Sequence, residues 1–411
     1  QLASDELGVS AEVFLLLAAA LGQPPSLTRR AASMRRNRSF EADIGRAVSA
    51  AVAAEKFEDI DSALSEAVTQ LDSLAVNTVE PTKLKFDALI GMGGYGSVFL
   101  VSDASNSRQF ALKMLRKGLL AGKSDLPKRA LREKEALETL RHPFISKLHM
   151  TFQDEDSLYY LLDLATGGDL YALLDIHPVF PEAWALFYTA SLALALRHMH
   201  KHCYVYRDMK PENVLLDSGG YVCLADMGFA KKVEDRTFTA CGTDEYVPPE
   251  LLEGKGRTAA ADWWGLGVLL HEMITGRTPF EGNTTEIFAQ ITKYHKGGDD
   301  TNEKLRLSLS AVSEECGDLV SGLLIGDESG RLGSGPEGFL GIQMHAWFKS
   351  LKWGALLHRE MAAPYIPPPF DASKMEVPAD EQVMRKRNFD KAKIEPLFAS
   401  FGPTVSMPQA K

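Results

Sequence analysis

Residues 206–228 read YRDMKPENVLLDSGGYVCLADMG, and the interpretation of the whole chain starts from them. Asp208, Lys210 and Asn213 are followed by an apolar run, a Ser-Gly-Gly turn and a second acid, Asp226. Such a turn between apolar runs predicts a β-hairpin. Mg²⁺ takes oxygen ligands from one or two protein groups together with substrate phosphates, so Asn213 and Asp226 are candidate metal ligands. Asp208 remains as the catalytic acceptor of a hydroxyl proton, and Lys210 can neutralise charge on a phosphoryl group.

This stretch resembles the catalytic and metal-binding loops of protein kinases, HRDxxxxN followed by DFG. Tyr206 replaces the His, as it does in the AGC group of serine/threonine kinases, and Met227 replaces the Phe. Methionine is flexible and apolar, so we interpret the second change as tolerated packing. The resemblance implies an α+β, bilobal protein kinase fold with a small β-rich N-lobe and a large helical C-lobe. It also implies an enzyme that uses ATP and Mg²⁺.

Composition narrows the class of protein. The chain has 411 residues, with 45% hydrophobic and 24% charged, as in ordinary globular proteins. A formal net charge of -10 argues against a general nucleic-acid binder. The longest apolar run, residues 13–21, is too short to span a bilayer. The cysteines form no CxxC pair and no zinc spacing, which favours free thiols in a reducing, cytoplasmic compartment.

The resemblance divides the chain into three parts. These are a helical N-terminal extension (1–83) with an arginine-rich linker (26–39), a kinase domain (84–348) with an N-lobe (84–162) and a C-lobe (166–348), and an AGC-type C-terminal tail (349–411). The many prolines of the tail exclude regular helix. Phe398 and Phe401 match the hydrophobic motif that such tails dock onto the small lobe.

A glycine-rich segment, GMGGYGSV at residues 91–98, lies between two β-like runs and predicts a hairpin over phosphates. Alone, this pattern also fits a dinucleotide-binding fold. Val98 at its end, and Lys113 in the FALK run that follows, favour the kinase interpretation. The resemblance then implies that ATP is bound by Gly91, Gly93, Gly94, Gly96, Val98, Ala111, Lys113, Glu133, Asp163, Ala165, Asp169 and Leu215.

Downstream, residues 229–250 resemble the activation and substrate-docking segment of cyclic-nucleotide-dependent kinases. Thr239 is at the position phosphorylated in that family. A phosphate there would attract the Arg207 and Lys231 cations and order the segment.

The resemblance implies further structural roles. Glu250, in PPE instead of the usual APE, is expected to pair with Arg331 as a buried ion pair. Asp262 is expected to brace the backbone of the catalytic loop. The apolar residues that connect the lobes are Leu137, Leu148, Tyr206 and Met227.

The substrate class follows from three acids. Asp169, Glu212 and Glu272 match those that receive arginines two and three residues before the target Ser or Thr in the cyclic-AMP-dependent kinase. Guanidinium to carboxylate contacts favour Arg over Lys. In the linker, Ser33 and Ser39 each follow an arginine by three residues. As a hypothesis, the linker is an internal substrate or an autoinhibitory arm. The composition by itself favours a flexible, solvated linker, and a segment that faces an acidic membrane or partner is a further alternative.

Two other interpretations stay open. A kinase-fold scaffold, or pseudokinase subunit, would act by protein binding. It would be expected to lack Lys113, Asp208 or Asp226, and all three are present. A cyclic-nucleotide-gated kinase would need a β-rich regulatory domain, and the segment before the glycine-rich loop is helical in pattern and too short for the usual pair. The expected partners are protein substrates with basic sites, and a regulatory subunit or an upstream kinase.

Overall fold

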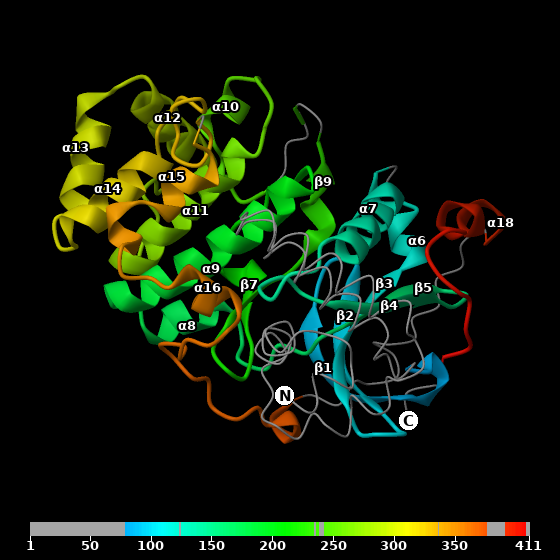
Figure 1. Cartoon of the computed structure of the whole chain (residues 1–411). Coiled ribbons are helices and arrows are strands. Elements are labelled where there is room, and N and C mark those ends of the chain that lie inside the picture. Colours follow the sequence, from blue (N-terminus) through cyan, green and yellow to red (C-terminus); the bar gives the residue numbers. More distant parts are fainter. Residues whose placement is uncertain are drawn as a thin grey trace, which may run out of the picture. The chain divides into compact units, whose positions relative to one another are not determined.

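The computed structural model describes residues 79–407, apart from 123–124, 234–235, 238–241, 336 and 376–390. From Glu80 onward the chain forms one unit. In this unit a sheet-rich lobe joins a larger helical lobe (Figure 1), which confirms the predicted bilobal α+β kinase fold. The arginine-rich linker, with Ser33 and Ser39, lies outside the described residues.

The small lobe is built on a five-stranded antiparallel sheet with the order β1-β2-β3-β5-β4. Its elements are the turn η2 (Pro81–Lys83), the strands β1 (Leu84–Met92), β2 (Gly96–Asp103), β3 (Gln109–Arg116), β4 (Leu148–Gln153) and β5 (Ser157–Leu162), and the helices α6 (Lys117–Leu120) and α7 (Leu126–Thr139). The glycine-rich segment is the turn of the β1–β2 hairpin, as predicted. Leu126, Ala130 and Leu137 bury one side of α7 in the hydrophobic core.

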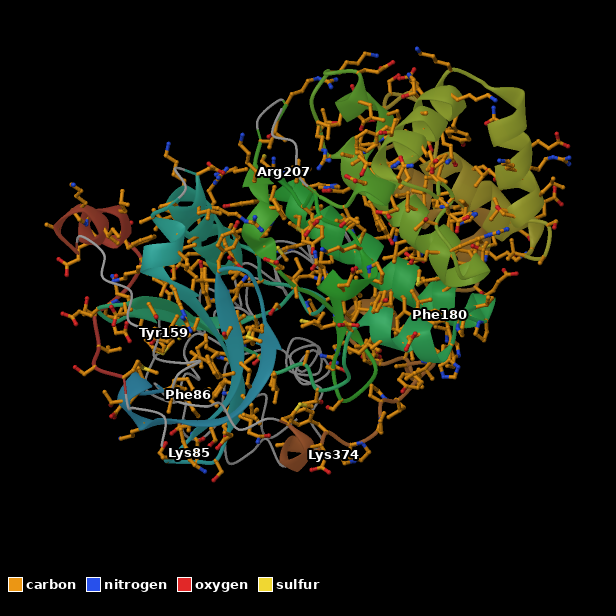
Figure 2. The ribbon with its side chains drawn as sticks, turned by 180° about the vertical axis from the view of Figure 1, so that it is seen from behind. Lys85, Phe86, Tyr159, Phe180, Arg207 and Lys374 are labelled. Carbon is orange, nitrogen blue, oxygen red and sulfur yellow. The ribbon has the colours of Figure 1, made fainter. Side chains whose placement is uncertain are left out.

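Helices form the large lobe, coloured green to orange in Figure 1. They are α8 (Leu170–Ile176), α9 (Glu182–Lys201), α10 (Pro249–Leu252), α11 (Ala260–Thr275), α12 (Thr284–His295), α13 (Asp299–Ser308), α14 (Glu314–Leu323), α15 (Phe339–Gln343) and α16 (Trp353–Leu357). The middle of α9 and nearly all of α11 are buried, because apolar residues occupy every side of both helices. Figure 2 shows Phe180 among these helices and Tyr159 on the sheet of the other lobe.

Short elements between α9 and α11 carry the predicted site. They are β6 (Tyr204–Val205), η3 (Pro211–Asn213), β7 (Val214–Leu216), β8 (Val222–Leu224), η4 (Met227–Phe229), β9 (Lys231–Lys232) and η5 (Asp244–Tyr246). The predicted hairpin is confirmed, because β7 and β8 pair in antiparallel fashion around the Ser-Gly-Gly turn. This pairing holds two segments at the same end of the hairpin, the candidate catalytic loop (206–213) and the candidate metal-binding loop (225–229).

The C-terminal tail contacts both lobes. Its described elements are α16, η7 (Ala372–Lys374), α18 (Lys391–Ile394) and η8 (Glu395–Phe398), and η6 (Ala346–Phe348) comes just before it. The expectation that the tail has no regular helix was wrong for α16, because the prolines begin only at Pro364. On the large lobe, the Tyr365 ring lies 5.6 Å from that of Trp184, and Arg359 pairs with Asp217. The last part of the tail, drawn in red, runs beside the small lobe (Figure 1).

The predicted aromatic pair of the tail is docked on the small lobe. Phe398 and Phe401 are fully buried. The Phe401 ring meets the edge of the Tyr160 ring at 5.1 Å, and the Tyr160 hydroxyl donates to the Ala130 carbonyl of α7 at 2.8 Å. Lys134 Nζ on α7 donates to the Ser400 carbonyl at 2.8 Å, so the tail also contacts the helix that carries Glu133.

Backbone pairing continues beyond Phe401. The Gln153 amide donates to the Pro403 carbonyl at 3.0 Å, and the Val405 amide donates to the Gln153 carbonyl at 2.8 Å. The Gln153 side-chain nitrogen donates to the carbonyls of Phe398 (3.1 Å) and Gly402 (2.8 Å). Since β4 is an edge strand, the tail pairs with its exposed edge.

We expect Gly402→Val to lower the free energy of unfolding by about 1–3 kcal/mol and to release the end of the tail. A Cβ at Gly402 would lie 2.6 Å from the Thr151 carbonyl oxygen and 2.9 Å from its carbon, both of which are backbone atoms. Chemical unfolding and hydrogen exchange of residues 398–405 measure the two effects. Ser400→Val, at an exposed position nearby, is the matched control. Equal losses for the two variants would mean that the close approach at Gly402 does not position the tail.

Candidate active site

Lys113 on β3 joins two acids that are distant in sequence. Its Nζ lies 2.6 Å from Oε1 of Glu133 on α7 and 3.2 Å from Oδ1 of Asp226 in the metal-binding loop. The partners lie 20 and 113 positions away along the chain. The small lobe, its helix and the large lobe therefore meet at one ammonium group.

Lys113 attracts both carboxylates, whereas burial, followed by repulsion from Asp226, raises the pKa of Glu133. Burial alone would lower the pKa of Lys113, but the carboxylates of Glu133 and Asp226 outweigh it and raise that pKa above its usual value. The Lys113 ammonium in turn lowers the pKa of Asp226 to about 2, so this carboxylate is ionised at neutral pH. An ionised carboxylate is the form that binds a metal ion.

Asp226 has a left-handed backbone, with φ of 49°. This conformation is uncommon for a residue other than glycine, and Asp and Asn adopt it more readily than most. Its Oδ1 also accepts a hydrogen bond from the Gly228 amide at 3.2 Å. The turn thereby directs the carboxylate toward Lys113.

Asp208 and Asn213 form the centre of the catalytic loop. The Asn213 side-chain nitrogen donates to the Asp208 carbonyl at 2.8 Å and to its Oδ2 at 2.7 Å. Lys210 Nζ lies 4.0 Å from the same Oδ2. Burial raises the pKa of Asp208, although Lys210 and Asn213 oppose the shift. A carboxylate with a raised pKa is a better acceptor for a hydroxyl proton than an ordinary aspartate.

The two candidate metal ligands fit Mg²⁺. The Ala225 amide donates to the Asn213 backbone carbonyl at 2.9 Å, which places Asn213 beside the loop of Asp226. Asn213 uses its side-chain nitrogen for the bonds to Asp208, so its side-chain oxygen remains for a metal. One carboxylate and one amide oxygen, completed by phosphate oxygens, are a donor set that suits this hard cation.

Asp262 on α11 braces the catalytic loop, as predicted. Its Oδ2 accepts from the Tyr206 amide and its Oδ1 from the Arg207 amide, both at 2.8 Å. His200 Nε2 lies 2.8 Å from Oδ2. Because Asp262 is 1% exposed, these contacts occur away from water and hold the loop firmly.

The apolar positions expected to connect the lobes are all in the core. Leu137, Leu148, Tyr206 and Met227 are at most 5% exposed. Met227 is completely buried, in keeping with its interpretation as tolerated packing. The Tyr206 hydroxyl donates to the Ala225 carbonyl at 2.7 Å, which links the catalytic loop to the metal-binding loop.

The remaining predicted nucleotide-binding residues come from five places in the fold. Gly91, Gly93, Gly94, Gly96 and Val98 belong to the β1–β2 hairpin, Ala111 to β3, Asp163 and Ala165 to the segment after β5, and Asp169 and Leu215 to the start of α8 and to β7. Asp169 and Leu215 face each other in a β-bridge. The Asp163 carboxylate meets His149 Nε2 at 2.5 Å.

Two of the three predicted substrate acids lie close together. The Tyr246 hydroxyl donates to Oε2 of Glu272. Burial raises the pKa of Glu272, and the charges of Glu212 and Glu245 add to the shift. Asp169 has a different local role, since its Oδ1 caps α8 by accepting from the Ala172 amide at 2.7 Å. Sequence reasoning missed Tyr246 and Glu245, although the acids just before Tyr246 in the DEY run were a signal.

The activation segment is described only in part, and Thr239 lies outside the described residues. The two cations expected to attract its phosphate both reach Thr237. Arg207 Nη1 donates to the Thr237 hydroxyl at 3.0 Å, and Lys231 Nζ donates to it at 3.3 Å. Thr237 is 1% exposed, and Arg207 lies close to the border of the two lobes in Figure 2. Both cations therefore bind a residue that lies two positions before Thr239 in the sequence.

The predicted ion pair of Glu250 and Arg331 is confirmed. Arg331 donates to both oxygens of Glu250, at 3.0 and 2.8 Å, and neither side chain is more than 3% exposed. Arg331 also donates to the carbonyls of Ala260 and Ile325, at 2.8 and 2.9 Å. The pair thus ties the docking segment to α11 and to the loop after α14.

Residues 84–348 match the protein kinase domain family. The chain belongs to the protein kinase family. Within the described residues of this kinase, no helix is both long and apolar enough to cross a membrane.

Several curated proteins are similar to this kinase. The cAMP-dependent protein kinase catalytic subunit of Dictyostelium discoideum is 37% identical over 301 residues, which are 72% of this chain and 45% of that protein. Ribosomal protein S6 kinase alpha-3 of Homo sapiens is 38% identical over 295 residues, 70% of this chain and 38% of that protein. The serine/threonine-protein kinase AtPK2/AtPK19 of Arabidopsis thaliana is 38% identical over 281 residues, 68% of this chain and 57% of that protein.

These relatives place the kinase in the AGC group of serine/threonine kinases, as predicted. The matched part of each relative is less than two thirds of its own length, from 38% to 57%.

Proposed function

We propose that this kinase transfers the terminal phosphoryl group of ATP to Ser or Thr hydroxyls of proteins. One observation supports the proposal above all. Lys113 joins Glu133 and Asp226 at 2.6 and 3.2 Å, so the phosphate-binding lysine, its helix and the metal-binding acid are assembled together. Asp208, hydrogen-bonded to Asn213, belongs to the catalytic loop next to them.

Each residue has a proposed part in the reaction. The glycine-rich hairpin covers the nucleotide, the backbone of Asp163 to Ala165 receives the adenine, and Lys113 holds the phosphates. Bound Mg²⁺, held by Asn213 and Asp226, would neutralise charge on the phosphate oxygens. Asp208 orients the incoming hydroxyl and accepts its proton, and Lys210 neutralises charge on the transferred group. Because the transition state of phosphoryl transfer is loose, positioning and charge neutralisation carry most of the acceleration.

We also propose that phosphate on Thr239, added by an upstream kinase or by the kinase itself, orders the activation segment. Arg207 and Lys231 already converge on the Thr237 hydroxyl, two residues before it. A phosphate carries close to two negative charges at neutral pH and forms strong hydrogen bonds with such cations. Arg207 also adjoins Asp208, so order in the segment would be passed to the catalytic loop.

The proposed substrates have Arg two and three residues before the phosphorylated Ser or Thr. Glu212, Glu245 and Glu272 gather around Tyr246, whose pKa is raised by burial and by these three charges. Acids held close together repel one another, and an arginine relieves that repulsion by pairing with them. Asp169, at the start of α8, is the third predicted acid.

We expect Glu272→Gln to reduce kcat/KM for an arginine-containing peptide by roughly 10- to 100-fold, because a charge-assisted hydrogen bond is lost. The KM for ATP and the rate with a peptide that has Ala in place of the arginines should hardly change. Steady-state kinetics with the two peptides measure this difference. Glu281→Gln, at an exposed acid between α11 and α12, is the control. A wild-type kinase that does not prefer the arginine peptide would contradict the proposed specificity.

A further inference from the structure

Arg129 on α7 contacts the metal-binding loop. It lies one turn before Glu133, and its guanidinium carbon is 3.5 Å from the centroid of the Phe229 ring. Phe229 directly follows Gly228 in the loop that Asp226 begins. The backbone carbonyl of Phe229 accepts a hydrogen bond from Arg207 Nε at 2.8 Å. Two arginines from different lobes therefore hold this one residue.

The loop fits closely around Arg129. A Cβ on Gly228 would lie 2.9 Å from Arg129 Nε and 3.0 Å from its Nη2, and also 3.0 Å from Asp226 Oδ1. Real Cβ atoms need more room than this, so the guanidinium can lie against the loop because residue 228 has no side chain. The contact of Arg129 with the loop therefore depends on the absence of a side chain at Gly228 as well as on the Phe229 ring.

We propose that Arg129 is a positioning residue for the metal-binding loop. By stacking on Phe229 it forms a second connection between α7 and this loop, beside the one that Lys113 makes between Glu133 and Asp226. The residue between Asp226 and Gly228 is Met227, whose flexible side chain specifies position less tightly than an aromatic ring. The planar guanidinium of Arg129, stacked on the Phe229 ring, holds the loop in the position that Met227 specifies less tightly. The inference rests on the proposed function of Asp226 in metal binding.

A double-mutant cycle tests the proposal. Arg129→Met keeps the apolar stem and removes the guanidinium, and Phe229→Leu removes the ring. We expect each variant to lower kcat/KM for Mg·ATP by about tenfold, which is the range of a partly desolvated cation–π contact. The double variant should be no worse than the single variants, and Arg129→Lys should recover part of the loss. Arg132→Met is the control, because Arg132 lies on the same helix and pairs with Asp125 at 3.0 Å.

Three outcomes would overturn the proposal. They are unchanged kinetics in Arg129→Met, losses that add in the double variant, and a loss that disappears in a Thr239→Ala background, which would show that Arg129 acts through the activation segment. The affinity for Mg·ADP can be measured by calorimetry on the same variants. It provides a second double-mutant cycle that does not depend on catalysis. A wild type that binds Mg·ADP and transfers no phosphate would therefore contradict the proposed function and still allow the Arg129 cycle to be measured.

Discussion

The Asp226→Asn variant is expected to lose on the order of 10³-fold or more in kcat with an arginine-containing peptide, because one charged metal ligand is removed. Asp226 is ionised at neutral pH, since Lys113 lowers its pKa to about 2. An amide has nearly the same shape but no charge, so Mg²⁺ would be bound weakly and out of place. Lys113 keeps its contact with Glu133 at 2.6 Å, and the fold should therefore persist.

The measurement is the rate of peptide phosphorylation as Mg²⁺ is varied, together with the melting temperature of each variant. Asp175→Asn, at an exposed acid of α8, is the matched control and should retain full activity. If the Asp226→Asn variant and the wild type were equally active, the proposed metal site would be wrong. If neither transferred phosphate to any peptide, the interpretation as a kinase-fold scaffold would be favoured.

The second large effect is expected on stability. Arg331→Met should lower the free energy of unfolding by about 3–5 kcal/mol, because it leaves a buried carboxylate without its cation. Glu250 is 2% exposed, and Arg331 supplies hydrogen bonds to both of its oxygens. Met has a similar length to the Arg stem, so the loss comes mainly from the charge and not from a cavity. Chemical denaturation monitored by circular dichroism measures the effect.

A surface pair provides the comparison. Lys255 and Glu253 lie 2.7 Å apart, and their side chains are 59% and 27% exposed. Water screens such a pair, so Lys255→Met should leave the free energy of unfolding nearly unchanged. Similar losses for Arg331→Met and Lys255→Met would mean that burial does not determine the cost of breaking the Glu250–Arg331 pair.

Much of the site could be predicted from short stretches of sequence. The order of Asp208, Asn213 and Asp226 around a turn specified a hairpin that holds the two loops together. The glycines before Val98 specified the other hairpin. Local backbone preference and apolar pattern determine such features, because their hydrogen bonds join residues near in sequence. The bilobal fold then followed from the resemblance that these motifs carry.

Contacts between distant segments could not be predicted in this way. The sequence placed Arg129 on a charged helix, and only the tertiary structure sets it on the Phe229 ring at 3.5 Å. The pairing of Gln153 with the tail at Pro403, and of Tyr246 with Glu272, was likewise missed.

The sequence by itself determined the family and the two hairpins, and it supplied the candidate catalytic groups. The resemblance already predicted the Glu250–Arg331 pair, but only the tertiary structure decided that Arg129 lies on Phe229 and where the tail pairs with the sheet. The physical reason is that helix and strand patterns depend on neighbouring residues, whereas a contact across the chain depends on how the lobes, the helix α7 and the tail pack together.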